Sequence, residues 1–241
     1  MKEIRYFFMP EPEVGALPED EAVHAVRVLR LSAGDEMMLM DGCGTFYKAR
    51  VTMTTPKRCH YEIVERMPQE PQWTGCVHLA TAPTKLMDRM EWLAEKATEV
   101  GFDELTFLDC QFSERRTLKL SRIDKIVVSA VKQSRKAWMP QLNDMTSFKQ
   151  FISSHQTGAR YIAHCYDEVP RVNLFTELQK GGVQDALVMI GPEGDFSIDE
   201  VRMAVDAGFI SVDLGKSRLR TETAGLAAVM MMQLAKEKLN S

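Results

Sequence analysis

The clearest candidate for a functional site is a cationic turn in the stretch LGKSRLRTETAGLAAV, residues 214–229. A short apolar strand runs into Gly215, basic residues follow at Lys216, Arg218 and Arg220, and a nearly all-apolar helix begins at once. The helix dipole is positive at the N-terminus, so cations placed before a helix are locally unfavourable. Such a placement indicates that an anion binds there, and arginines lying over the surface explain it equally well.

A second candidate is the loop GPEG, residues 191–194, which follows another apolar strand. Glycine lets the backbone approach a ligand closely, and in open α/β sheets ligands bind beyond the carboxyl ends of the strands. Ser197 and Glu200 have the spacing of a capping box, so a helix is predicted to begin there. The loop fits neither the dinucleotide fingerprint nor the Walker motif. Taken alone, it is most simply a tight connection between strand and helix.

Both candidates lie in a region where strands and helices alternate, which predicts a parallel sheet with helices on both faces. Strand-like runs are predicted at 77–82, 104–110, 160–166, 186–191 and 211–215. A helix is predicted between the first two runs because apolar residues recur at steps of four and three, and Gly101 ends it. A second apolar stripe, from Ile123 to Val131, predicts another helix.

The amino-terminal region has a different order of predicted elements, with mostly strands and little helix. Short strand-like runs at 36–42, 45–53 and 60–67 are separated by turn residues, with one helical pattern at 19–30. The proline-containing stretch MPQEPQW, residues 67–73, is typical of a linker. We therefore expect a β-rich domain over 1–70 and an α/β domain over 71–241.

Composition narrows the class of protein. No apolar run of the 241 residues approaches the ~20 that a membrane span needs, and the N-terminus has no signal-peptide pattern. Five cysteines without a CxxC pair predict neither disulfides nor a metal site, so the reducing cytoplasm is the expected compartment. The net charge of the chain is −4, but the segment 111–140 carries an excess of Lys and Arg. This local excess favours a phosphate-facing surface.

The two candidate sites in combination are more specific. GPEGDFS followed by LGKSRLRTETA resembles the SPOUT methyltransferases, in particular the family that methylates N3 of a uridine in 16S ribosomal RNA. The segments RYFF, HAVRVLRL, GDEMMLMDG, KLMDRMEWLAEKATEVGF and KQSRKAWMPQL look like signatures of that family in the expected order, so the resemblance covers essentially the whole chain. Two departures are Asp195, where the family usually has glycine, and Arg116, where it usually has serine.

The resemblance implies a PUA-like β-barrel followed by an α/β domain whose last segment is threaded into a trefoil knot. It also implies a homodimer with a site at the subunit interface. The cofactor would be S-adenosylmethionine, held by the backbone of the turn after 164–166, the GPEG loop and residues 214–219. The cofactor-binding residues expected from this are Ile190, Gly191, Glu193, Gly194, Leu214, Gly215, Leu219 and Thr223.

The implied reaction sets the roles of the cations. When the N3 proton of uridine leaves, negative charge spreads onto O2 and O4, and a guanidinium can stabilise it with fixed donors, without a metal. We expect Arg220 in this role, with Arg218 as the alternative. Glu222 would accept the proton or orient an arginine, and a capping or ion-pair role suits it nearly as well.

The implied partner is 16S rRNA or the small ribosomal subunit. A split basic surface would contact its phosphates, with no membrane partner expected. The RNA-binding residues expected are Arg5, Arg27, Arg30, Arg115, Arg116, Lys132, Arg135 and Lys136. Two other functions fit the same residues: a non-catalytic ribosome-assembly factor, and a related methyltransferase that acts on another base or on a ribose 2′-hydroxyl.

Overall fold

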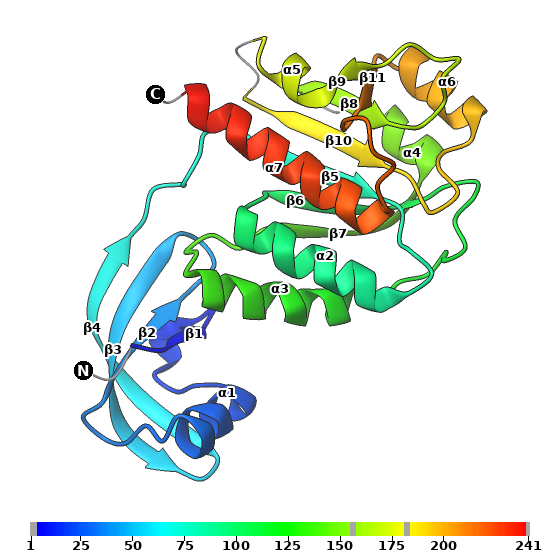
Figure 1. Cartoon of the computed structure of the whole chain (residues 1–241). Helices are drawn as coiled ribbons and strands as arrows, with labels where there is room; N and C mark the ends of the chain where they lie inside the picture. Colours follow the sequence, from blue (N-terminus) through cyan, green and yellow to red (C-terminus); the bar gives the residue numbers. More distant parts are fainter. Residues whose placement is uncertain (1–3, 155–157, 181–183, 240–241) are drawn as a thin grey trace. The chain divides into compact units, whose positions relative to one another are not determined.

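The computed structural model describes residues 4–154, 158–180 and 184–239 (Figure 1). The chain divides into two compact units, which we describe separately. The first takes the described residues up to Gln72 together with Val131–Met139, and the second takes Trp73–Ala130 and the described residues from Pro140 onward. The units are therefore not two consecutive stretches of sequence. No helix among the described residues is long and apolar enough to cross a membrane.

The first unit is built on a four-stranded sheet in the order β1-β2-β3-β4. Strand β1 pairs with β2 in parallel, whereas β2, β3 and β4 pair antiparallel. The strand bounds are Tyr6–Phe8, Glu36–Met40, Thr45–Thr55 and Arg58–Pro68. A short 3-10 helix spans Pro12–Val14, and α1 (Glu19–Val23) continues into a π-helical turn (His24–Val28). Alternating apolar side chains of the strands, such as Met37 and Leu39, close the core against these helices.

Residues 131–139 pack onto this sheet through Trp138. The Trp138 indole N–H donates to the carbonyl oxygen of Gln69 at 3.2 Å, and a Cβ on Gly44 would lie only 2.3 Å from the Trp138 ring. Gly44 also has a φ of +99°, which disfavours other residues. The turn around Gly44 is therefore shaped to receive the indole.

The second unit contains a seven-stranded sheet in the order β7-β6-β5-β10-β8-β11-β9, with every neighbouring pair parallel. The predicted runs correspond to β5 (Val77–Thr81), β6 (Glu104–Asp109), β8 (Ala159–Ala163), β10 (Ala186–Ile190) and β11 (Ile210–Asp213). The predicted parallel α/β fold is confirmed. The two edge strands were not foreseen, because β7 (Gln141–Ser147) is polar and β9 (Val172–Asn173) is very short.

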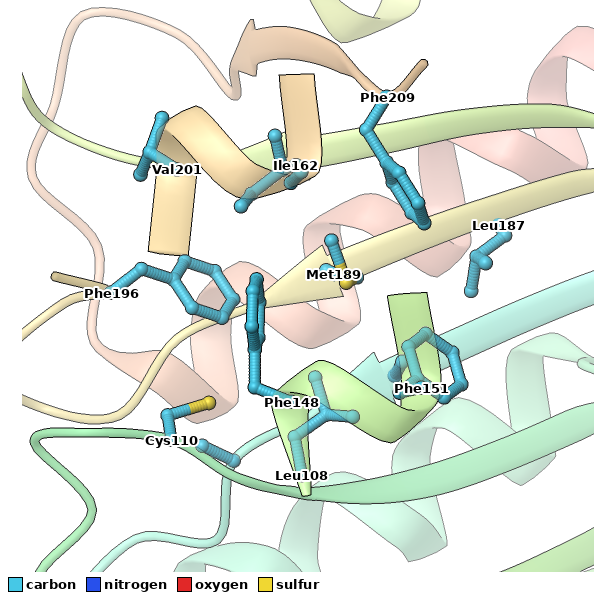
Figure 2. Packing of buried hydrophobic residues seen from close by; sticks show 13 residues of the cluster. Leu108, Cys110, Phe148, Phe151, Ile162, Leu187, Met189, Phe196, Val201 and Phe209 are labelled. Carbon is cyan, nitrogen blue, oxygen red and sulfur yellow. The ribbon is translucent and has the colours of Figure 1, made fainter. Parts of the chain in front are cut away.

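Helices cover both faces of this sheet (Figure 1). On one face, α2 (Met87–Val100) and α7 (Thr221–Leu239) lie side by side, and α7 packs on β5 and β10. On the other face, α4 (Phe148–Ser153) and α6 (Ile198–Asp206) close an aromatic-rich core in which Phe148, Phe196 and Phe209 surround Met189 (Figure 2). The remaining helices are α3 (Leu120–Ser134) and α5 (Leu174–Leu178). Because it is covered on both faces, β10 is buried at every position.

The connection between β8 and β9 explains the threading of the chain. Ala163 at the end of β8 and Val172 at the start of β9 both align with Val212 of β11, which lies between them. Residues 164–171 therefore bridge the carboxyl end of β11. The chain that leaves β11 after Asp213 has to pass this bridge to reach α7. This is the crossing that the expected knot requires. The strands β8 and β11 both end earlier than predicted, at Ala163 and Asp213, and the chain then enters this crossing.

Candidate active site

A cavity of about 380 Å³ opens at the carboxyl ends of β8, β10 and β11. Three loops supply most of its wall: 163–165 with Arg171, 190–195 except Gly194, and 212–221 except Lys216. The remaining lining residues are Arg89 of α2 and Ala224 of α7. The two candidate sites found in the sequence therefore share one hollow, because the carboxyl ends of parallel strands meet at one edge of the sheet.

Most of the residues expected to hold a cofactor lie on this wall. The lining includes Ile190, Gly191, Glu193, Leu214, Gly215 and Leu219, and both Arg218 and Arg220. Three expected residues do not line it. Gly194 faces Phe112, Thr223 is exposed on α7, and Glu222 is buried beneath the wall. Residues that are adjacent in sequence thus face different parts of the fold, and only some of them face the cavity.

Hydrogen bonds join the three loops into one frame. The Thr221 hydroxyl donates to the carbonyl oxygen of Gly191 at 3.1 Å, so it connects the start of α7 to the GPEG loop. The backbone N–H of Lys85 donates to Glu193 Oε1 at 2.9 Å, which ties the same loop to the segment before α2. Thr221 is the first residue of α7, and among the described residues its hydroxyl bonds to the loop and not to the backbone of its own helix.

Asp195, the departure from the family's glycine, keeps the backbone conformation that favours glycine, with a φ of +69°. Its carboxylate accepts the backbone N–H of Phe196 at 2.8 Å and that of Cys165 at 2.8 Å. The second contact connects the GPEG loop to the bridge over β11. Asp195 therefore adds a connection that glycine has no side chain to make.

Close backbone packing defines the GPEG loop. A Cβ on Gly191 would lie 2.8 Å from the backbone nitrogen of Phe196, closer than real contacts allow. Ser197 and Glu200 form the predicted capping box, which fixes the start of α6 behind the loop. Glu200 also accepts the Gln111 backbone N–H at 2.8 Å, so the loop after β6 is held in the same frame.

His164 contributes a neutral ring to the cavity wall. Its Nδ1 accepts the backbone N–H of Tyr166 at 3.2 Å, which places the ring proton on Nε2. Burial lowers the pKa of His164, with nearby Arg171 acting in the same direction and Asp195 opposing it. Arg171 also donates to the His164 carbonyl oxygen at 2.9 Å. The turn after residues 164–166 was expected to hold the cofactor, but neither His164 nor Arg171 was among the expected site residues, since no motif marks them.

Positive charge gathers around the cavity from separate elements. Arg218 and Arg220 are exposed, and neither forms an ion pair within the described part of the chain. Arg89, which sequence reasoning also missed, lies 3.7 Å from Glu222, measured from Nε to Oε1. The cationic turn therefore does not stand alone, because Arg89 of α2 and Arg171 add two further guanidiniums to the wall.

The cations expected to bind RNA have several other partners. Arg115 donates to the carbonyl oxygens of Thr84 and Lys85, and Arg116 donates to Asp109 and to the carbonyl oxygen of Gln111. Much of the positive charge of this segment thus stabilises the loops that carry it, and only the exposed remainder is available to phosphates.

The first unit shows the same pattern. Lys132 pairs with Glu21, and Lys136, whose pKa burial lowers, donates to Gln72 Oε1 at 3.2 Å. The Arg135 guanidinium lies over the ring of Tyr6, 5.3 Å from its centroid. Arg5, Arg27 and Arg30 are exposed.

Comparison with known proteins places this site in a class. Residues 71–233 match a family described as an RNA methyltransferase domain, and residues 17–64 match one described as an RNA methyltransferase PUA domain. The first match covers more than half of the chain. The protein therefore belongs to the RNA methyltransferase family, and its fold is that of the SPOUT methyltransferases.

Individual relatives agree with this placement. A crystal structure of a probable rRNA-methyltransferase from Porphyromonas gingivalis is 39% identical, covers 98% of this chain and 99% of its own, and superposes with a TM-score of 0.91. A ribosomal RNA small subunit methyltransferase E from Neisseria gonorrhoeae, bound to S-adenosyl methionine, is 27% identical with a TM-score of 0.81, over 96% of this chain and 98% of its own. The protein of the same name from Bacillus subtilis is 25% identical over 98% of each chain.

Proposed function

We propose that this protein methylates N3 of a uridine in the RNA of the small ribosomal subunit, with S-adenosylmethionine as methyl donor. The single observation that carries the proposal is the shared cavity formed by the GPEG loop and the cationic turn. Family membership supports RNA methylation, and the names of the relatives support small-subunit rRNA as the substrate. The cytoplasm is the compartment that this substrate implies. The choice of N3 rests on the resemblance and on the arginines at the cavity.

The residues present suit the cofactor. Gly191 leaves no room for a side chain on its packed side, and Gly215 has a φ of +117° that favours glycine, so backbone is presented at both loops. Ile190, Leu214 and Leu219 supply apolar walls for a flat heterocycle. When bound there, S-adenosylmethionine would supply a methyl group activated by the sulfonium.

The chain's own contribution is charge stabilisation. Arg220 stands at the cavity with no ion-pair partner among the described residues, so its guanidinium can donate to the uracil oxygens that gain negative charge. Arg218 lies two residues earlier and can take the same role or bind an adjacent phosphate. The frame formed by Thr221, Gly191 and Asp195 holds these loops in place before substrate arrives.

A homodimer is part of the proposal. The nearly all-apolar sequence of α7 predicts a helix that is buried or lies against a partner chain, and Met230 is 46% exposed and Leu234 is 50% exposed. Trp92 on the neighbouring helix α2 is 42% exposed. Apolar side chains of this size on adjacent helices suit burial against a second copy. Light scattering at micromolar concentration tests this, and a monomer would contradict it.

The decisive experiment has two parts. Mass spectrometry of 16S rRNA from cells that lack the gene should show the loss of one methyluridine, restored by the intact gene. Purified protein should transfer a labelled methyl group to small subunits or 16S rRNA from those cells. If the label appears on a ribose or on another base, the N3 assignment is wrong. If cofactor binds but no RNA is labelled, the protein is a non-catalytic binding factor.

A further inference from the structure

Helices α2 and α7 pack side by side (Figure 1). The first turns of both helices contribute residues to the cavity wall. A Cβ on Gly225 would lie 3.0 Å from Leu93 Cδ2, so glycine at this position allows the close approach. Both helices follow strands of the same parallel sheet, and one turn nearer their starts lie Arg89 of α2 and Glu222 of α7. Their Nε and Oε1 atoms are 3.7 Å apart. Packing of the helices therefore brings these two charges together.

Arg89 and Glu222 differ in their access to the cavity. Glu222 is only 8% exposed and does not line the cavity, and its Oε2 is shielded from solvent with no hydrogen-bond partner in the described part of the chain. The side chain of Arg89 is 31% exposed and does line the cavity. A buried carboxylate is costly unless a cation compensates it, and Arg89 supplies that cation. Only the arginine can contact a bound molecule.

The start of α2 is held firmly, so Arg89 has a defined position. The Thr84 hydroxyl donates to the carbonyl oxygen of Leu86 at 2.8 Å, and Arg115 donates to the carbonyl oxygen of Lys85 at 2.7 Å. The same segment is tied to the GPEG loop through the Lys85 backbone N–H and Glu193. The first turn of α2 is therefore part of the frame that surrounds the cavity.

Arg89 retains donors for a ligand. Its guanidinium faces Glu222 through Nε, and no hydrogen bond from this side chain is formed within the described residues. A guanidinium presents its donors in a planar fork that matches an anionic carboxylate or phosphate. Arg218 and Arg220 stand on the same cavity, and like charges that share a site are favourable only with an anion between them.

We propose that Arg89 binds an anionic oxygen at this cavity and that Glu222 is a positioning residue acting through Arg89. The anion is the carboxylate of the cofactor's amino-acid moiety or a phosphate of the RNA. Glu222 is then not the proton acceptor, because its carboxylate does not reach the cavity. The inference rests on the proposed function, since that function supplies both anions.

The test compares Arg89→Gln, Glu222→Gln and the double variant. Each single change leaves one charge without its partner. In Arg89→Gln the unpaired charge is the buried carboxylate of Glu222, so a loss of stability in the single variants is expected for that reason alone. The double variant leaves no charge unpaired and is expected to melt within a few degrees of the parent. It should nevertheless lose roughly tenfold or more in ligand binding, as expected for one lost charged contact. The matched control is Glu91→Gln with Arg122→Gln, an ion pair of α2 and α3 whose members do not line the cavity.

Two binding measurements identify the anion. Weaker binding of S-adenosylhomocysteine by calorimetry assigns the carboxylate. Weaker RNA binding at saturating S-adenosylhomocysteine, with a salt slope reduced by about one, assigns a phosphate. If the double variant binds both ligands like the parent and keeps the parental KM, the pair is structural and the proposal is wrong.

Glu222→Gln gives an independent readout. A positioning residue should change KM or ligand affinity. A proton acceptor should instead lower kcat by about 100- to 10,000-fold and remove one limb of the pH profile, with both affinities unchanged. The second result would overturn the assignment of Glu222. A parent protein that binds both ligands but methylates no RNA would contradict the proposed function, and the binding tests of Arg89 would still be readable.

Discussion

The hydroxyl of Thr221, the first residue of α7, donates a hydrogen bond of 3.1 Å to the carbonyl oxygen of Gly191. This bond joins the end of the cationic turn to the GPEG loop, although β8 separates the strands β10 and β11 from which the two segments emerge. Both groups are buried, so water does not replace a lost partner. The bond therefore fixes the relative position of two walls of the cavity.

Replacing Thr221 with valine should weaken cofactor binding and destabilise the fold. Valine keeps the shape but leaves the Gly191 carbonyl oxygen buried without a partner, at a cost of about 1–3 kcal/mol. Thr221→Ser keeps the hydroxyl and should stay close to the parent. Thermal melting and calorimetry with S-adenosylmethionine check this. A valine variant with parental affinity and melting temperature would show that the bond does not matter.

Replacing Arg220 with alanine should lower the rate of methyl transfer by roughly 100- to 1,000-fold at saturating cofactor and RNA, the usual cost of one lost donor to a developing anion. Cofactor affinity should change little. Arg202→Ala on α6 is the control, because Arg202 is also exposed but does not line the cavity. Single-turnover kinetics measure the rate. An Arg220 variant within a few-fold of the parent would exclude this role.

Replacing Arg115 with alanine should impair the cofactor site and leave RNA electrostatics unchanged. Arg115 was expected to face RNA, but its guanidinium donates to the carbonyl oxygens before α2. We expect a lower melting temperature and weaker cofactor binding. The control is Lys119→Ala, an exposed cation of the same segment. A salt slope of RNA binding that falls by about one, with parental cofactor affinity, would restore the original assignment.

Replacing Tyr61 with phenylalanine should change stability at alkaline pH. Burial raises the pKa of Tyr61 from 10.0 to about 12, and its hydroxyl donates to the Pro12 carbonyl oxygen at 2.7 Å. Between these two pH values the unfolded tyrosine loses its proton and the folded one keeps it. The stabilisation is therefore complete below pH 10 and is lost as pH rises towards 12, with a slope of about 1.4 kcal/mol per pH unit for one proton.

The phenylalanine variant lacks this titration. It should be less stable than the parent near neutral pH, because the Pro12 carbonyl oxygen loses its partner, and the difference should shrink above pH 10. Urea unfolding at several pH values measures both effects. A constant difference between the two proteins from pH 8 to 12 would contradict the shifted pKa.

Local sequence pattern determined much of the second unit. The apolar runs and the amphipathic stripe before Gly101 predicted five strands and α2. They could do so because hydrophobic periodicity, and the glycines and turn residues that end an element, can be read from residues close together in sequence. The cavity could be anticipated from GPEG and LGK, since strand ends of a parallel sheet share one edge. The polar edge strand β7 carries no such signal, since only one side of it pairs.

The chain by itself thus determined which elements form, where glycine must stand and which family the motifs resemble. Tertiary structure alone decided which charges meet. Arg89 and Glu222 lie on helices far apart in sequence, and their contact depends on α2 and α7 packing side by side. Similarly, Arg115 and Lys132 look like surface cations in sequence and have partners in the fold. A charge's partner depends on distance in space, and only the completed strand order sets that distance.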